Sequence, residues 1–546
     1  MMDFPLSITH LLERGRAISG GVEVVTRRPD KSVLRQTYAD TYRRAEALGR
    51  GLHALGLKPG ERVGTLCWNH REHLEAYLGI PAAGMVVHTL NLRLHPDELA
   101  FIVNDAADAA VIVDRSLWPL WQKFADRVPS VRRVIVVRDD HGPVPDGAID
   151  HEAVLAGHHP LARGPGMAQP VGTPFAYGDE RAAAMICYTS GTTGHPKGVV
   201  YTHRSTVLHA LATGMRDAIG IGCDDVVLPV VPMFHAAAWG LPYGAFATGA
   251  KIVFPGPHLD PVSLLDLMVS EKVTIAGGVP TIWLGILAEL DKAPDRWDLS
   301  AVRTMVIGGS AAPPSLIKGF QERHGLEVTH AWGMTETNPL GTLARPTPAV
   351  RARGEAAVFE ARASQGTPVP FVEIRHVDDV GTALPWDGET MGELEVRGPW
   401  VAGSYLGDQG PDRFTADGWF KTGDVVTIDA DGYVRITDRS KDVIKSGGEW
   451  ISSVALENAL MAHPAVLEAA VFAVPHPKWD ERPVAAIVVK AGHSVDDAAL
   501  LAHLDGKFAR FWLPEAFVYL VQIPRTSTGK FLKSALRSAH AGLLSG

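Results

Sequence analysis

Cysteine is scarce in this chain of 546 residues, which contains only Cys67, Cys187 and Cys223 and has no Cys-x-x-Cys pair. Three scattered cysteines offer no disulfide framework and are typical of a reducing compartment, so we expect a cytoplasmic protein. Long apolar runs are also missing, since no stretch approaches the ~18 apolar residues of a membrane span. Residues 1–16 lack the basic leader and the cleavage site of a signal peptide. We therefore expect no integral membrane contact.

Basic residues are not in excess either, because 52 lysines and arginines face 61 acidic residues and the net charge is −9. A duplex-binding surface needs surplus lysine and arginine to neutralise phosphates, so we expect no nucleic acid partner. Any phosphate ligand must then be held by local groups. The hydrophobic content of 46% and charged content of 21% are ordinary for a soluble globular protein, and the length allows several domains.

One loop, Cys187-Tyr-Thr-Ser-Gly-Thr-Thr-Gly-His-Pro-Lys-Gly-Val199, concentrates groups that bind phosphate. Its glycines let the backbone approach an anion, its hydroxyls donate hydrogen bonds and its lysine supplies positive charge. It is not a Walker A loop, because the lysine precedes Gly198 and a strand-like segment rather than a helix. The loop predicts a polyphosphate ligand, with an ordinary polar surface loop as the alternative. The candidate binding residues are Thr189, Ser190, Gly191, Thr192, Thr193, Gly194 and Lys197.

Hydrophobic periodicity predicts an α/β fold. Residues 37–57 read as an amphipathic helix, with apolar side chains at three- and four-residue spacing. Similar helical stretches alternate with short apolar runs, from Val63–Cys67 to Val302–Ile307, that read as strands. This alternation is typical of parallel sheets covered by helices, and we expect two such sheets.

The pattern also predicts how the chain divides. Residues 1–438 are expected to form a large N-terminal domain, which includes a small β-rich subdomain at about 369–437 with short strands and Asp-Gly turns. The polar residues 439–442 are a candidate hinge. Residues 443–546 are long enough to form a small C-terminal domain that mixes helices and strands.

Two carboxylates occupy settings that suit a nucleotide. Glu336 lies in His330-Ala-Trp-Gly-Met-Thr-Glu-Thr337 after a predicted strand, and carboxylate oxygens are ligands that Mg²⁺ prefers when it bridges to phosphates. Asp424 ends Trp419-Phe-Lys-Thr-Gly-Asp just beyond a predicted tight turn, where it can accept both hydroxyls of a ribose. The alternatives are a helix-start carboxylate at Glu336 and an ordinary turn residue at Asp424.

Several of these segments resemble motifs of the adenylate-forming superfamily, which includes acyl- and aryl-CoA synthetases, peptide-synthetase adenylation domains and luciferases. Tyr188–Gly198 resembles its signature loop, residues 330–336 its Tyr-Gly-x-Thr-Glu motif with Trp332 in place of the tyrosine, and Pro524–Lys530 its Pro-x-x-x-x-Gly-Lys motif. The resemblance implies ATP and coenzyme A as co-substrates, Mg²⁺ as cofactor, a carboxylic acid as the activated substrate and a homodimer. It also implies that an acyl-adenylate forms first and that the acyl group then passes to coenzyme A.

The same resemblance implies roles for individual residues. Lys530 would bridge the substrate carboxylate and the α-phosphate in the first step, and the C-terminal domain would be mobile, swinging about Lys441 before the second. Glu336 and Thr189 would hold Mg²⁺. The implied catalytic residues are Lys530, His235 and Thr335. Beyond the phosphate loop, the implied nucleotide-binding residues are Gly309, His330, Ala331, Trp332, Thr335, Asp424, Arg439, Lys441, Lys445 and Trp450.

The segment Val231–Trp239 bears on which acid is activated. Peptide-synthetase domains carry an aspartate here for the substrate's ammonium group, whereas this chain has Phe234 and His235, which disfavours an amino acid. The whole chain looks most like bacterial medium- and long-chain fatty acyl-CoA synthetases, in which an indole similar to Trp239 closes an acyl tunnel; core packing is the alternative for this side chain. The expected acyl pocket comprises Trp239, Phe234, His235 and Gly308.

Other functions remain open from the sequence. Related synthetases accept a short thioether acid, such as methylthiopropionate, or an aromatic acid. A ligase that charges a carrier protein would use the same first step with another thiol acceptor. A nucleotide sensor without catalysis is disfavoured because Lys197, Glu336, Asp424, Arg439 and Lys530 are all present.

Overall fold

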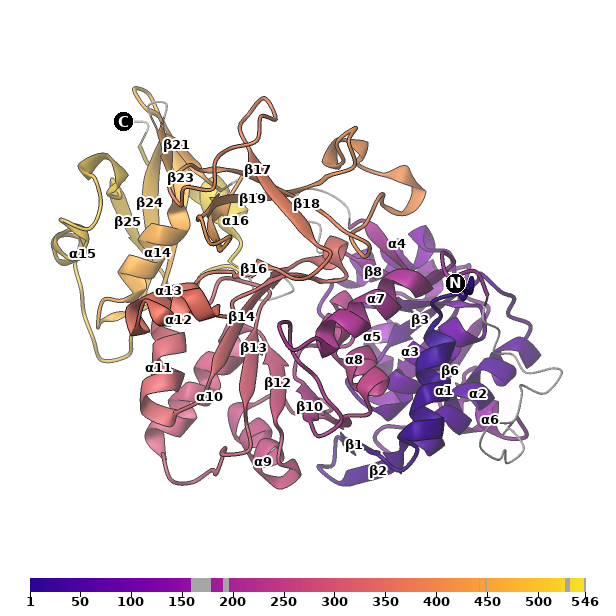
Figure 1. Cartoon of the computed structure of the whole chain (residues 1–546). Coiled ribbons are helices and arrows are strands. Elements are labelled where there is room, and N and C mark those ends of the chain that lie inside the picture. The colour runs from indigo at the N-terminus through magenta and orange to yellow at the C-terminus, as the bar shows by residue number, and fades with distance from the viewer. Residues whose placement is uncertain (159–177, 190–195, 441, 447–448, 526–530, 545–546) are drawn as a thin grey trace.

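The computed structural model describes residues 1–158, 178–189, 196–440, 442–446, 449–525 and 531–544. Helices alternate with strands along most of this length, which confirms the predicted α/β class (Figure 1). Parallel strands that are covered by helices are buried on both faces, and this is why these strands appear as continuous apolar runs in the sequence. Among the described residues, no helix combines the length and the apolar character needed to cross a membrane.

The larger sheet has the strand order β16-β15-β14-β13-β12-β10-β11-β1-β2. Neighbouring strands from β14 to β1 are parallel, and antiparallel strands complete both edges. The strands β13 and β14 therefore end side by side, and each leads into a segment with predicted site residues. The bounds are β1 Glu23–Arg27, β2 Val33–Thr37, β10 Val226–Pro229, β11 Lys251–Phe254, β12 Ile275–Gly278, β13 Thr304–Ile307, β14 Val328–Gly333, β15 Leu340–Leu343 and β16 Thr367–Pro368.

A second sheet has the order β7-β6-β5-β3-β4-β8-β9. All neighbours are parallel except β8 and β9, which form an antiparallel pair at one edge. The predicted phosphate loop joins these two strands. The bounds are β3 Arg62–Leu66, β4 Val86–Thr89, β5 Asp108–Asp114, β6 Arg133–Val137, β7 Ile149–Asp150, β8 Ala183–Tyr188 and β9 Gly198–Thr202.

Helices between the two sheets build a shared core. Side chains of α1, α2, α3, α7 and α8 join strands of both sheets in one buried hydrophobic cluster. The helix α2 begins at a capping box, in which Thr37 and Asp40 satisfy each other's backbone N–H groups. The bounds are α1 Ile8–Ile18, α2 Tyr38–Ala54, α3 Arg71–Ala82, α4 Pro96–Asp105, α5 Trp118–Trp121, α6 His151–Leu155, α7 His203–Gly214, α8 Leu241–Thr248, α9 Pro261–Glu271, α10 Pro280–Lys292, α11 Pro314–His324, α12 Pro348–Ala352 and α13 Glu355–Ala363.

An antiparallel sheet of order β17-β18-β19-β20 follows. It occupies the region that the sequence predicts to be rich in β-structure, but it corrects one detail. Asp424 lies within β19, opposite Arg439 on β20, rather than just beyond a tight turn. The bounds are β17 Glu373–Val377, β18 Gly392–Arg397, β19 Phe420–Ile428 and β20 Val434–Arg439.

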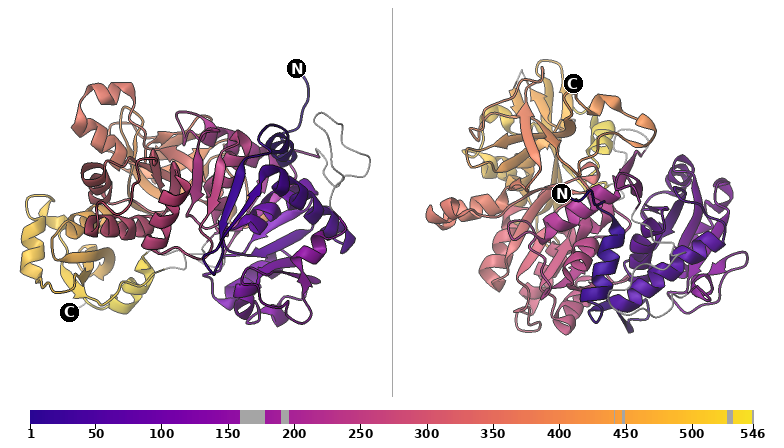
Figure 2. Two further views of the ribbon diagram at one scale, coloured as in Figure 1. Left: turned by 90° about the horizontal axis from the view of Figure 1, so that it is seen from below. Right: turned by 45° about the vertical axis from the view of Figure 1, so that its right-hand side comes forward.

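The C-terminal residues form a separate lobe, drawn in yellow on the side opposite the N-terminal helices in Figure 2. Its sheet has the order β22-β21-β24-β23, with β25 paired to β24, and helices pack against it over cores of their own. This mixture agrees with the predicted α+β character. The bounds are β21 Ile444–Ser446, β22 Glu449–Ile451, β23 Val466–His476, β24 Asp480–Val489, β25 Ala516–Tyr519, α14 Ser453–Met461, α15 Asp497–Leu504 and α16 Lys533–His540.

Candidate functional site

Thr189 and Lys197 close the base of the predicted phosphate loop. The Thr189 N–H donates to the Lys197 carbonyl over 2.9 Å, and the Lys197 N–H donates to the Thr189 hydroxyl over 3.2 Å. These two bonds continue the β8–β9 pairing, so both residues are fixed by the sheet edge. The other predicted loop residues, Ser190, Gly191, Thr192, Thr193 and Gly194, lie outside the described residues.

Tyr405 connects this loop to the predicted metal ligand. Lys197 Nζ lies 5.1 Å from the centroid of the Tyr405 ring, within the range of a cation–π contact. The Tyr405 hydroxyl donates to Glu336 Oε1 over 2.6 Å. Burial and the neighbouring Glu336 carboxylate both raise the pKa of Tyr405, so the phenol stays a hydrogen-bond donor. The sequence analysis did not identify Tyr405, because it belongs to no motif that we had recognised.

Thr335 and Glu336 form a buried turn, η4 (Thr335–Thr337), directly after β14. The Tyr201 hydroxyl donates to the Thr335 carbonyl over 2.6 Å, and the Ala402 N–H donates to the Glu336 carbonyl over 2.7 Å. Tyr201 lies on β9, so one hydrogen bond joins the edge of the second sheet to the end of the first. Contacts from β9 and from residues 402–405 therefore fix this turn and the Glu336 carboxylate.

Asp424 is held by one ion pair and one hydrogen bond. Arg439 Nε lies 2.8 Å from Asp424 Oδ1, and the Trp332 indole N–H donates to Asp424 Oδ2 over 2.9 Å. Asp424 is only 1% exposed, so the two contacts fix a carboxylate that would otherwise be costly to bury. The indole fits because Gly341 has no side chain: a Cβ there would lie 2.4 Å from a ring carbon of Trp332. The tryptophan thus adds a hydrogen bond that the sequence did not predict.

The loop after β13 lies against β14. The Ala312 N–H donates to His330 Nε2 over 3.3 Å, which requires a neutral imidazole. Burial lowers the pKa of His330 to about 4, in keeping with that role. Gly309 has a φ of +83°, a backbone conformation that favours glycine, and a Cβ there would lie 3.8 Å from a ring carbon of Trp239. The predicted residues Gly309, His330 and Ala331 are therefore brought together.

The segment predicted to line the acyl pocket forms a left-handed turn, η3 (Ala236–Gly240). Its residues have φ values of +42°, +49°, +49°, +57° and +70° along the chain, although the first four are not glycines. Such residues cost about 1–2 kcal/mol each in a left-handed conformation. The turn places the half-buried Trp239 beside Gly308, where a Cβ would lie 3.2 Å from a ring carbon of the indole. Phe234, immediately upstream, is buried.

Asn69 holds the entrance to this turn and was also missed by the sequence analysis. Its amide donates to the carbonyls of Pro229 and Val231, each over 2.9 Å, and its oxygen accepts from the Met233 N–H over 2.7 Å. Asn69 is 4% exposed and follows β3, on the other sheet. No local sequence signal marks a side chain whose partners lie about 160 positions away.

The residues predicted to form a hinge lie between the last strand of the antiparallel sheet and the C-terminal lobe. Asp438 Oδ2 accepts from the Ser453 N–H over 2.6 Å, at the start of α14. Lys445 and Trp450 lie opposite each other on β21 and β22, and so on the C-terminal lobe rather than on the sheets that carry the cluster above. The predicted residues Lys441 and Lys530 lie outside the described residues.

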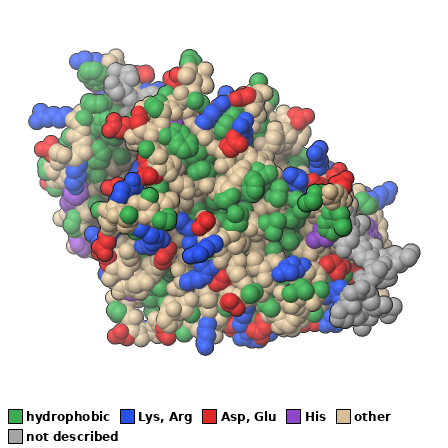
Figure 3. Space-filling model, in the orientation of Figure 1, with side chains coloured by type: hydrophobic (Ala, Val, Ile, Leu, Met, Phe, Trp, Pro, Cys, Tyr) green, Lys and Arg blue, Asp and Glu red, His purple; other side chains and the backbone are tan. Residues whose placement is uncertain are grey.

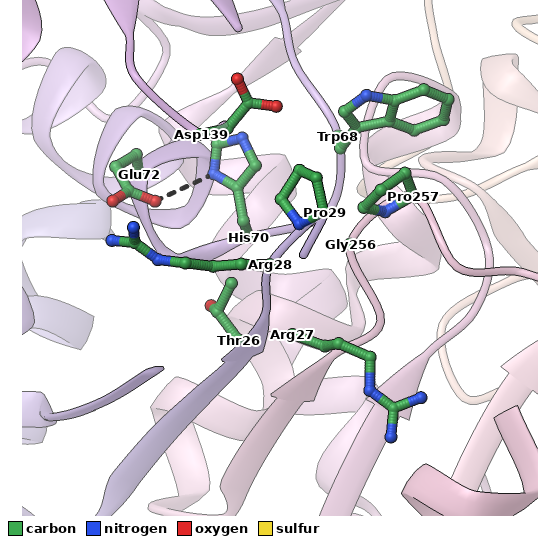
Figure 4. A pocket seen from close by; sticks show the side chains of 10 residues that line it. All are labelled: Thr26, Arg27, Arg28, Pro29, Trp68, His70, Glu72, Asp139, Gly256 and Pro257. Atoms are coloured by element: carbon green, nitrogen blue, oxygen red, sulfur yellow. Dashed lines mark ion pairs between the residues drawn. The ribbon is translucent and has the colours of Figure 1, made fainter. Parts of the chain in front are cut away.

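A cavity away from this cluster contains none of the predicted site residues (Figure 4). Behind it, Cys67, His70 and Asp114 bring potential metal-ligating atoms within 4.8 Å of one another. His70 Nε2 lies 2.8 Å from Asp114 Oδ1, and Asp114 Oδ2 accepts from the Trp68 N–H over 2.7 Å. Burial opposes charge on His70, but Asp114 raises its pKa well above the ordinary value. We interpret this group as a structural ion pair.

Charged side chains of both signs are interspersed on the face shown in Figure 3. This face presents no broad basic area to a phosphate backbone.

Comparison with known proteins agrees with the motifs over the whole chain. Residues 22–406 match the AMP-binding enzyme family, and residues 455–530 match the AMP-binding enzyme C-terminal domain. The chain is 46% identical to a long-chain-fatty-acid–CoA ligase of Thermus thermophilus, over 100% of this chain and 98% of that protein. It is 44% identical to a 3-methylmercaptopropionyl-CoA ligase of Ruegeria lacuscaerulensis, over 100% and 99%. Its fold matches the crystal structure of the anthranilate CoA ligase AuaEII in complex with anthranoyl-AMP, with a TM-score of 0.86, 26% identity and coverage of 100% and 99%.

Proposed function

Because the chain belongs to the AMP-binding enzyme family and is an AMP-forming CoA ligase, we propose that its substrate is a medium- or long-chain fatty acid. In the first step a carboxylate oxygen attacks the α-phosphorus of ATP, the bond to the bridging oxygen breaks and pyrophosphate leaves. In the second step the thiol of coenzyme A attacks the acyl carbon, loses its proton and displaces AMP. Both steps depend mainly on orientation and charge stabilisation.

The phosphate loop and Glu336 would handle the pyrophosphate. Lys197 would contribute positive charge at the loop base, and the loop hydroxyls would donate hydrogen bonds. The buried carboxylate of Glu336 and the Thr189 hydroxyl would offer hard oxygen ligands of the kind that suits Mg²⁺. The ion, when bound, would neutralise charge on the phosphates. We assign the Mg²⁺ to these two residues.

The remaining nucleotide would lie between β14 and β19. Asp424, oriented by Arg439 and Trp332, would accept the ribose hydroxyls. The indole of Trp332, with Ala331 and His330, would form the adenine side, and Gly309 would contact the nucleotide through its backbone. Thr335 would donate to the α-phosphate. Lys530 would stabilise the charge that develops there in the first step, and His235 would assist next to the acid.

Residues 439–442 would act as the hinge between domains 1–438 and 443–546. This assignment is supported by the strand bounds, since β20 ends at Arg439 and β21 begins at Ile444. Rotation about Lys441 would carry Lys445 and Trp450 to the adenylate for the second step. We further propose a cytoplasmic homodimer.

The setting of Trp239 carries the proposal for a fatty acid. Glycines border its ring: a Cβ on Gly308 would lie 3.2 Å from it, and one on Gly277 would lie 3.7 Å away. A half-buried indole that borders glycines has space beside part of its ring, which suits a gate over an apolar chain. Burial of such a chain is worth about 0.8 kcal/mol per CH₂. The relative named as a long-chain-fatty-acid–CoA ligase, at 46% identity, supports the same substrate class.

A short thioether acid is the second candidate, because a relative named as a 3-methylmercaptopropionyl-CoA ligase has a similar identity of 44%. An aromatic acid and a carrier-protein thiol are further alternatives. Pyrophosphate release with ATP, Mg²⁺ and coenzyme A, measured across three-carbon thioether, aromatic and C6 to C16 fatty acids, separates them. We expect the highest kcat/KM at medium or long chains, and a flatter chain-length profile in Trp239→Ala. An optimum at the thioether acid would overturn the fatty-acid proposal and leave the adenylation chemistry intact.

A further inference from the structure

Tyr405 lies where two charged groups of the proposed site approach each other. It is 4% exposed and directly precedes η5 (Leu406–Asp408). Its hydroxyl donates to Glu336 Oε1 over 2.6 Å, and Lys197 Nζ lies 5.1 Å from its ring centroid. One neutral side chain therefore contacts both the proposed metal ligand and the lysine of the phosphate loop.

The surrounding backbone fixes this arrangement. The Ala402 N–H donates to the Glu336 carbonyl over 2.7 Å, and Phe414 packs edge-on against the Tyr405 ring with 5.7 Å between centroids. Gly410 leaves room for the ammonium, because a Cβ there would lie 2.3 Å from Lys197 Nζ. The segment from residue 402 to residue 414 thus contacts both Glu336 and Lys197 at the proposed phosphate end of the site.

A phenol at this position has a definite electrostatic effect. In a direct ion pair, the lysine and the glutamate would neutralise each other before a nucleotide bound. The ring instead attracts the ammonium through its face, while the hydroxyl donates to one carboxylate oxygen. A carboxylate has about four lone-pair sites, so one hydrogen bond orients the group and leaves acceptors for a cation.

We propose that Tyr405 is a positioning residue that aims the Glu336 carboxylate at the metal–pyrophosphate group and holds Lys197 beside it. This inference rests on the proposed function, in which Glu336 holds the divalent cation. Tyr405 would act through these two residues and would not touch the reacting atoms. Its hydroxyl would orient the carboxylate that holds the metal, and its ring would hold the lysine through a cation–π contact.

The two parts of the side chain can be separated by substitution. Tyr405→Phe keeps the ring and its packing but removes the hydroxyl, whereas Tyr405→Leu removes both. Binding of ATP to the full chain is titrated calorimetrically in EDTA, and binding of Mn²⁺ to the enzyme–ATP complex is followed by electron paramagnetic resonance, without acid or coenzyme A. Tyr433→Phe is the matched control, because this tyrosine is also buried and its hydroxyl donates to the Arg345 carbonyl over 2.8 Å, away from the site.

We expect Tyr405→Phe to weaken Mn²⁺ binding by roughly 10- to 100-fold, the loss typical of a hydrogen bond to a charged group, and to leave metal-free ATP binding within about twofold. Tyr405→Leu should also weaken metal-free ATP binding. In Glu336→Gln, adding Tyr405→Phe should cause little further loss, because the hydroxyl acts only through the carboxylate. Unchanged Mn²⁺ binding in Tyr405→Phe, or equal losses with and without metal, would overturn the proposal.

The Glu336→Gln variant alone distinguishes the two levels of the argument. If Glu336→Gln weakens Mn²⁺ binding but Tyr405→Phe does not, only the positioning role fails. If Glu336→Gln has no effect on Mn²⁺ binding, the proposed metal ligand is wrong and the role of Tyr405 falls with it.

Discussion

The nucleotide end and the acyl end of the candidate site are held in different ways. At the nucleotide end, buried side chains hold one another: Asp424 by Trp332 and Arg439, and Glu336 by Tyr405. At the acyl end, Asn69 holds backbone groups at the entrance to a strained left-handed turn. The geometry of the proposed nucleotide end thus depends on side-chain identity, whereas that of the proposed acyl end depends on backbone conformation.

This difference has a consequence for variation. A residue at the nucleotide end has a charged or hydrogen-bonding partner that its replacement would leave unpaired in a buried site, which is costly. At the acyl end the alanines of the turn contribute no polar group, so side chains can change there at the cost of local packing and strain. We therefore expect substitutions at the two ends to separate effects on ATP from effects on the acid.

The largest expected effect concerns the protonation of His330 at the nucleotide end. Its folded pKa of about 4 lies below the unfolded value of 6.5, so the unfolded chain binds a proton that the folded chain excludes between these values. The contribution to stability is complete above pH 6.5 and is lost as the pH falls, by about 3 kcal/mol at pH 4. In urea unfolding between pH 7 and pH 4, His330→Gln should lose less stability than the parent by up to that amount. Parallel pH profiles would contradict this.

At the acyl end, Asn69→Ala leaves two carbonyls and one N–H without their buried partner. We expect the free energy of unfolding to fall by about 2 kcal/mol. The KM for the acid should rise, while ATP affinity stays within about twofold, because the clamp contacts only the segment 229–233. Asn104→Ala is the control, since this exposed amide donates to the Arg127 carbonyl over 2.9 Å. Equal losses of affinity for ATP and for the acid would contradict the proposed separation of the two ends.

The sequence predicted the parts of the site that lie in local motifs. The strand predicted at Val63–Cys67 is found only one residue earlier, at Arg62–Leu66, because an apolar run between turns is a local signal. Trp332 and Asp424 were each identified, but their hydrogen bond was not, since it joins positions on different sheets. Asn69 and Tyr405 were missed for the same reason: their roles arise only from contacts between distant segments.

A smaller effect should follow from removing the indole N–H of Trp332. Trp332→Phe keeps an aromatic face for adenine but leaves Asp424 with Arg439 alone, so we expect the KM for ATP to rise roughly 5- to 10-fold. Preference for ATP over 2′-deoxy-ATP should also fall, because the carboxylate is less firmly aimed at the ribose. Trp400→Phe is the matched control, since this buried indole donates to the Leu340 carbonyl over 3.0 Å. An equal preference for ATP over 2′-deoxy-ATP in both variants would contradict a role for the Trp332 hydrogen bond.

The smallest effect tests the strain at the acyl end. Ala238 is fully buried with a φ of +49°, and Ala210 is fully buried inside α7. Changing either to glycine loses one methyl group and adds freedom to the unfolded chain, but only Ala238→Gly relieves a left-handed conformation. We expect Ala210→Gly to lower the free energy of unfolding by about 1.5 kcal/mol, and Ala238→Gly to change it by less than about 0.5 kcal/mol. Equal losses of stability in the two variants would show that the turn holds no strain. A broader range of accepted acids in Ala238→Gly alone would establish backbone conformation as the determinant of acid choice.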